Sequence, residues 1–164
     1  LEITGSGILT VAGHLWVVGN ITLQNSATVK MAPALGAQNV AIIADKPSNR
    51  LTSSIIRVQN SASFQNSGTT GSFVFLISQN NSAENGGGTA AIELSNNTSA
   101  MVAYAAHGLI PIANSVKLKE ATAYKIALSN SANVTYDSGL PHTVFQSGPG
   151  GSWSFIPGSY AISH

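Results

Sequence analysis

A short phrase that recurs along the chain constrains the fold more than any other feature of the sequence. The phrase places two aliphatic residues and an asparagine at alternate positions, in the form aliphatic-x-aliphatic-x-Asn. Its five clear copies end at Asn25, Asn60, Asn96, Asn114 and Asn130. Alternation with a period of two predicts short strands that bury one face. The recurrence predicts a chain that stacks copies of one small structural unit.

The spacing of the asparagines indicates how many units the chain contains. Successive copies lie 35, 36, 18 and 16 residues apart, so each long gap is about twice a short one. We therefore expect one degenerate copy inside each long gap. Residues 41–45 carry Ala, Ile and Asp at the repeat positions, with Asp45 in place of asparagine, and residues 73–80 end at Asn80.

With these two copies the repeat predicts a complete architecture. Units of this length are too short for a pair of helices, and Gly, Asn, Ser and Thr interrupt every helical pattern. The sequence predicts an all-β, single-domain parallel β-solenoid (β-helix) of about seven coils, with right-handed coiling. We expect residues 1–20 to form an N-terminal coil or cap and residues 21–140 to form the coils. Residues 141–164 are aromatic and lack the repeat, so we expect them to form a C-terminal cap.

The polar position that ends each copy is interpreted as structural rather than catalytic. Asparagine tolerates the left-handed backbone conformation that a corner between strands needs. Its amide can also bond the equivalent amide of the next coil, whereas an unpaired buried polar group costs about 1 to 3 kcal/mol. The expected column comprises Asn25, Asp45, Asn60, Asn80, Asn96, Asn114 and Asn130.

Composition limits the partners of such a domain. Only 8% of the residues are charged and the formal net charge is +1, so we expect no nucleic-acid partner. The uncharged polar surface is typical of extracellular β-rich domains. The longest apolar stretch, residues 101–113, is too short to cross a bilayer, so we expect no membrane contact by the domain itself. The chain begins without a start methionine, and we expect an anchoring segment to lie outside this sequence.

The sequence offers little catalytic chemistry. A polysaccharide-cleaving site needs carboxylates that converge on one groove, and only Glu120 and Asp137 are spaced to stack on neighbouring coils. The histidines have no metal-ligand spacing, and no serine lies in a nucleophile turn. We therefore expect no enzyme activity, no metal and no cofactor. A carbohydrate-binding or carbohydrate-active β-helix that uses Glu120 and Asp137 is an alternative.

A small group of basic and aromatic residues is the other candidate site. Three lysines between residues 117 and 125 form a basic stripe with tyrosines nearby in the sequence. Such lysines can discourage association of strand edges, or they can hold an acidic sugar. The candidate ligand contacts are Lys117, Lys119, Lys125, Glu120, Asp137 and Tyr124.

Residues 101–140, which close on Tyr136-Asp137-x-x-Leu140, resemble the β-helical C-terminal domain of PilX-like bacterial pilus assembly proteins. Residues 15–31 and the Gly-rich, Trp-containing residues 148–153 are similar to an early coil and to the end of that domain. The resemblance implies a non-enzymatic, extracellular structural or adhesive module of a bacterial pilus-associated or cell-surface protein. It implies pilus or cell-surface subunits as partners, with polysaccharide as a further candidate. A self-polymerising scaffold similar to bactofilins is an alternative. The aromatic residues of segment 141–164 argue against it.

Overall fold

A computed structural model describes residues 1–95, 102–113, 116–130 and 133–134. These residues form short β-strands and one turn of 3-10 helix, η1 (Pro33–Leu35), and no α-helix occurs within these ranges. Every pairing between the strands is parallel. The prediction of an all-β, parallel fold is confirmed. The expected C-terminal cap, residues 141–164, lies outside the described residues.

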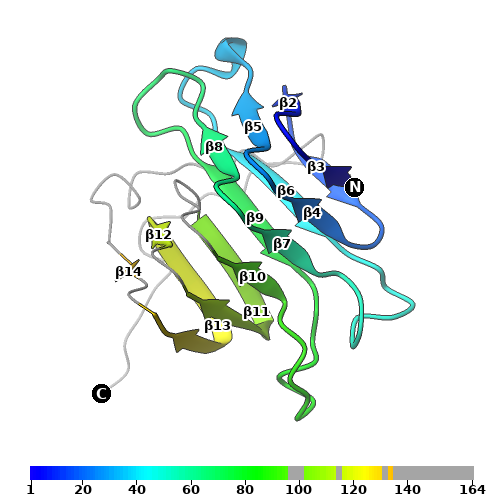
Figure 1. The fold of residues 1–164 in the computed structure, drawn as a ribbon. Helices are drawn as coiled ribbons and strands as arrows, with labels where there is room; N and C mark the ends of the chain where they lie inside the picture. Colours follow the sequence, from blue (N-terminus) through cyan, green and yellow to red (C-terminus); the bar gives the residue numbers. More distant parts are fainter. Residues whose placement is uncertain (96–101, 114–115, 131–132, 135–164) are drawn as a thin grey trace, which may run out of the picture.

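The strands fall into three groups that the chain visits in turn (Figure 1), and we call these groups the first, second and third faces. The first face begins with β1 (Glu2–Ile3), β4 (Ile21–Leu23), β7 (Ile56–Val58) and β10 (Ile92–Leu94). The second face contains β2 (Ile8–Val11), β5 (Thr28–Met31) and β8 (Ser63–Gln65). The third face begins with β3 (Leu15–Val17), β6 (Val40–Ala44) and β9 (Val74–Ser78).

The later strands join these faces. β11 (Val102–Ile112) pairs with β9 of the third face through its first half and with β10 of the first face at its end. β13 (Glu120–Leu128) follows β11 along both halves, with a register shift between Ala105 and Leu109. β12 (Lys117–Leu118) and β14 (Asn133–Val134) form a separate pair. The result is a curled parallel sheet, which is consistent with a β-solenoid.

The core consists of aligned side chains that point inward from the faces. On the first face, Ile21, Ile56 and Ile92 are paired in register and are fully buried. One step further along the same strands, Leu23, Val58 and Leu94 form a second buried row. The residue between them is only partly buried in each strand, so the alternation seen in the sequence is the alternation between core and surface.

The degenerate copies expected inside the long gaps do not belong to this column. Ile21 pairs directly with Ile56, and Ile56 pairs directly with Ile92, so each long gap is a single passage around the fold. Asp45 follows β6 and Asn80 follows β9, and both lie at the end of the third face. Placing these two residues in one column with Asn25 was wrong. The extra length lies in the connections 32–39, 45–55, 66–73 and 79–91.

Candidate functional site

The asparagines that follow the first face lie at its corner. The Nδ2 atom of Asn60 donates a hydrogen bond of 3.1 Å to Oδ1 of Asn25. Both residues have a left-handed backbone, with φ of 54° and 58°, and Asn130 has φ of 50°. This geometry fits the structural interpretation of these three asparagines. Asn96 and Asn114 lie outside the described residues.

Asp45 anchors the connection that follows β6. Its side chain is 2% exposed, and its two carboxylate oxygens accept hydrogen bonds from Nε and Nη2 of Arg50 at 2.8 and 2.9 Å. Two-point pairing of this kind is the strong geometry for arginine and a carboxylate. The hydrogen bond from Arg50 to Asp45 raises the pKa of the guanidinium, and their charge attraction adds to this effect against partial desolvation. Sequence analysis missed Arg50, although its separation of five residues from Asp45 was a usable signal.

Asn80 ties two of the long connections together. It is fully buried, and its Nδ2 atom donates to the carbonyl oxygens of Ser53 at 2.8 Å and Leu51 at 3.3 Å. Its Oδ1 atom accepts a hydrogen bond of 3.1 Å from the backbone N–H of Ser82. Asp45 and Asn80 are therefore structural residues, but they stabilise connections rather than a column of stacked amides.

The described lysines among the predicted ligand contacts, Lys119 and Lys125, lie in different places. Lys119 lies between β12 and β13, at the corner between the second and third faces. Lys125 lies further along β13, opposite Leu109 on the first face. The proposed stripe is therefore divided between different sides of the fold, because β13 turns from the third face to the first. Tyr124 is exposed beside Lys125.

Of the two acidic residues in the predicted site, the structure describes only Glu120. Glu120 begins β13 on the third face, where it accepts a hydrogen bond of 3.3 Å from Oγ1 of Thr122. Lys117 begins β12. Asp137 lies outside the described residues, so its pairing with Glu120 stays a prediction.

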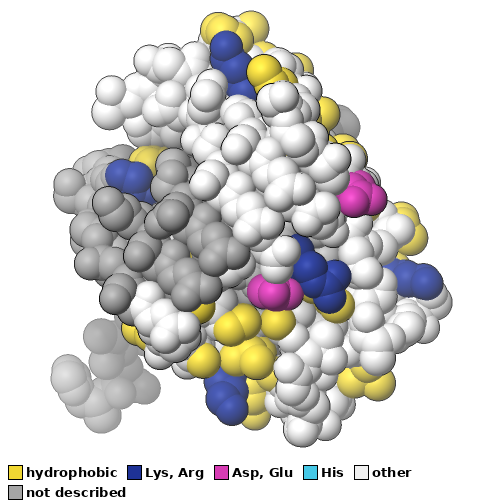
Figure 2. Space-filling model, in the orientation of Figure 1, with side chains coloured by type: hydrophobic (Ala, Val, Ile, Leu, Met, Phe, Trp, Pro, Cys, Tyr) yellow, Lys and Arg dark blue, Asp and Glu magenta, His cyan; other side chains and the backbone are white. Residues whose placement is uncertain are grey.

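Two other described carboxylates, Glu93 and Glu84, contact basic side chains at separate places. Glu93 accepts from Nε of Arg57 at 3.2 Å and from the amide of Gln59 at 2.8 Å. Glu84 lies 2.8 Å from Nδ1 of His107. Figure 2 shows that charged side chains on the visible face are few and scattered over an uncharged polar surface. In the part of the chain that the structure describes, no group of three His, Cys, Asp or Glu residues could hold a metal ion.

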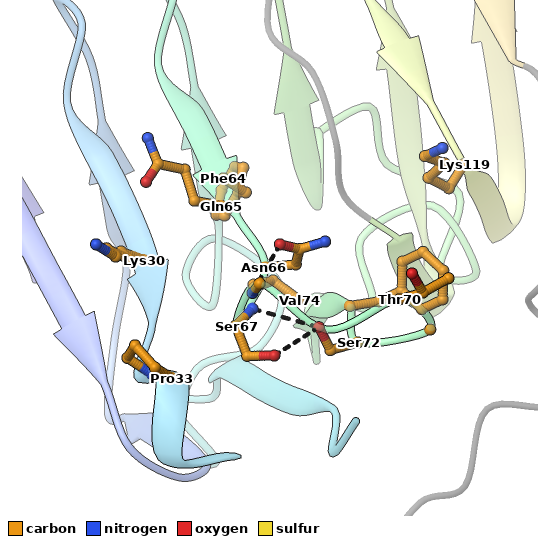
Figure 3. Close-up of a pocket in the computed structure, with 13 residues that line it drawn as sticks. Lys30, Pro33, Phe64, Gln65, Asn66, Ser67, Thr70, Ser72, Val74 and Lys119 are labelled. Atoms are coloured by element: carbon orange, nitrogen blue, oxygen red, sulfur yellow. Dashed lines mark hydrogen bonds between the residues drawn. The ribbon is translucent and has the colours of Figure 1, made fainter. Parts of the chain in front are cut away.

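A groove of about 730 Å³ lies along the corner between the second and third faces (Figure 3). Lys30 of β5 and Gln65 of β8 are paired in register and are both exposed at its border. Figure 3 shows Lys119 on the opposite side of the groove from Lys30. Of the described residues that line the groove, none is acidic. The polar lining includes Lys30, Gln65, Asn66, Thr70, Ser72 and Lys119.

The connection 66–73 forms a wall of the groove and is held by its own buried hydroxyls. The Ser72 hydroxyl donates to the carbonyl of Thr69 at 2.7 Å and accepts from the backbone N–H of Ser67 at 3.3 Å. The Ser67 hydroxyl donates to the carbonyl of Gly36, in the equivalent connection of the preceding passage. Gly68 and Gly71 have φ of 94° and 86°, values that residues with a Cβ rarely adopt. This wall is therefore set before any ligand arrives.

Sequence analysis missed most of this groove. Lys119 was named as a ligand contact, but Lys30 and the connection 66–73 were not. No local pattern joins Lys30 to Lys119, because the two residues become neighbours of one groove only through the winding of the chain.

Comparison with known protein families, with curated proteins and with solved structures finds no match to this chain. Within the described ranges, no helix has the length and apolar character needed to cross a bilayer.

Proposed function

We propose that this chain is a right-handed parallel β-solenoid with six turns in its described part. The first face supports this number, because β1, β4, β7, β10 and the second halves of β11 and β13 follow one another along it. Right-handed winding is the strong preference for a chain that leaves one parallel strand and returns beside it. We propose six turns in place of the expected seven or so coils, because each of the two long gaps between asparagines is taken as one turn.

The proposed function is that of a non-enzymatic structural and adhesive module of a bacterial pilus-associated or other cell-surface protein. The observation that carries this proposal is the position of the long connections between strands. The connections 32–39 and 66–73 enlarge the same corner of two successive turns and build the border of the groove there. Variable connections on a regular scaffold are where proteins place their binding surfaces. The resemblance of residues 101–140 to PilX-like domains supports the pilus-associated context.

Cell-surface accessibility tests this function. Intact cells that make the full-length protein are labelled with an antibody raised against the purified domain and, separately, are treated with an external protease. We expect labelling of intact cells and loss of the domain after protease treatment, with a cytoplasmic protein of the same cells as the control. Labelling that requires permeabilised cells would contradict the proposal.

The non-enzymatic part of the proposal has its own readout. The purified domain is incubated with acidic polysaccharides and the release of new chain ends is measured. No release is expected. Release that disappears in the Glu120→Ala variant would instead favour the carbohydrate-active alternative.

A further inference from the structure

We propose that the groove between the second and third faces binds a strand of acidic polysaccharide. This inference rests on the proposed adhesive function and names the chemical class of its ligand. The groove combines two lysines, one on each side, with amide and hydroxyl side chains between them. Lysine attracts carboxylate groups, while amides and hydroxyls can exchange hydrogen bonds with sugar hydroxyls.

The separation of the two lysines favours a chain-like anion over a small one. Lys30 belongs to the turn that contains β4 and β6, and Lys119 belongs to the turn that contains β12 and the start of β13. The pairings of β6 with β9, of β9 with β11 and of β11 with β13 place these turns three steps apart. At about 4.8 Å for each step, the backbones of the two lysines lie about 14 Å apart along the stack. A row of acidic sugars can span this separation wherever the two side chains point, whereas one phosphate or carboxylate would contact both lysines only if their side chains reached toward each other.

The lining between the lysines favours a saccharide over a nucleic acid. Gln65, Asn66 and Thr70 are exposed and present amide and hydroxyl groups to the groove. Proteins that hold single-stranded nucleic acid stack its bases on accessible aromatic rings. Two phenylalanines line the groove: Phe64 is only 5% exposed, and Phe73 is partly buried against the cluster of Ala41, Phe75 and Val102, so neither ring offers a wide surface for stacking.

The fixed wall of the groove lowers the entropic cost of binding. The hydroxyls of Ser67 and Ser72 are buried and hold the connection 66–73 in its observed shape. A wall that is ordered before the ligand arrives loses little conformational freedom on binding.

The experiment measures binding of fluorescent galacturonate oligomers by fluorescence anisotropy. The variants are Lys30→Gln, Lys119→Gln and the double variant. Lys125→Gln is the matched control, because it makes the same change of charge at an exposed position of β13 outside the groove. We expect each groove variant to bind a long oligomer about fivefold more weakly than the wild type. The control is expected to change affinity by less than about twofold.

Oligomer length gives a second, sharper readout. Affinity should rise between about two and about eight sugar units, as the ligand becomes long enough to reach both lysines. Lys119→Gln should remove most of this rise while leaving the binding of short oligomers nearly unchanged. Circular dichroism verifies that each variant is folded.

Several outcomes would overturn the proposal. They are equal weakening by Lys30→Gln and Lys125→Gln, equal binding of uncharged oligomers, or tighter binding of single-stranded DNA of the same charge. None of them affects the labelling of intact cells, so failure of the groove proposal is distinguishable from failure of the surface-module proposal.

Discussion

Asn60 shows how a single side chain shapes a corner of this molecule. Its φ of 54° lies in the left-handed region, and Ser61 after it has φ of 63°. Its amide also reaches Asn25 of the preceding turn. The residue therefore combines a backbone conformation that most side chains disfavour with a hydrogen bond between turns.

The variants Asn60→Ala and Asn60→Gly separate these two roles. Alanine disfavours the left-handed conformation and lacks the amide, so we expect Asn60→Ala to lower the free energy of unfolding by about 1 to 2 kcal/mol. Glycine adopts the conformation freely, so Asn60→Gly should lie closer to the wild type. Urea unfolding measures both. Equal destabilisation by the two variants would show that the side-chain hydrogen bond to Asn25, rather than the backbone conformation, accounts for most of the stability that Asn60 contributes.

At the scale of elements, the strands are too short to be stable singly and depend on the rows of side chains they share. β4, β7 and β10 each contribute three residues, and two of the three are buried. Ile56 lies in the middle of such a row, between Ile21 and Ile92. Its packing therefore links three turns.

Ile56→Ala tests this row. Removing part of a fully buried aliphatic side chain leaves a cavity and typically costs about 2 to 5 kcal/mol. The neighbouring Arg57→Ala is the control, because the Arg57 side chain is 39% exposed on the opposite side of the same strand. We expect the control to cost less than about 1 kcal/mol. Thermal unfolding followed by circular dichroism compares them, and similar losses in both variants would contradict the inward assignment of Ile56.

The length of the connections is the feature of the elements that sequence analysis misjudged. A gap of 35 residues is equally compatible with two short turns and with one turn that has long connections. The segment 41–45 lies in β6, a strand of the third face, where Val40, Ile42 and Ala44 enter the main core and the repeat positions Ala41 and Ile43 pack in a second cluster. Alternation reports that a segment has a buried side and does not report which face it joins.

At the scale of the whole molecule, the described core exposes apolar side chains at its last turn. Ile126 and Leu128 are paired in register with Ile110 and Ile112, which are fully buried. Ile126 and Leu128 themselves are 43% and 59% exposed. At the other end, Leu15 and Val17 of β3 are only partly buried, although they continue rows that are buried in β6.

Without the C-terminal cap that the sequence predicts for residues 141–164, these exposed apolar side chains predict weak end-to-end association, as in the self-polymerising alternative. One end of a copy differs from the other, so such contacts extend into filaments instead of closing. For a variant that lacks residues 141–164, light scattering and negative-stain microscopy across a concentration series should show growth in size, and the chain that keeps these residues should show less. Leu128→Lys should suppress it, because Leu128 continues the buried row of Ile112 and a charge on that inward side could not be covered by another turn. Thr122→Lys, on the exposed outer side of the same strand, is the control. Single rods of the shortened variant at every concentration would contradict the prediction.

The sequence by itself determined the all-β, parallel class and the inward alternation of the first face, as well as asparagine at its corners. These features are local, because a period of two and a tolerance for positive φ belong to short segments. Only the tertiary structure decided which segments share a face, that each long gap is one turn, and that Lys119 faces Lys30 across a groove rather than joining Lys125. The physical reason is that long connections can be added to a turn at small entropic cost and with no change in the strand pattern. Residues far apart in the sequence are therefore brought together by the winding of the chain.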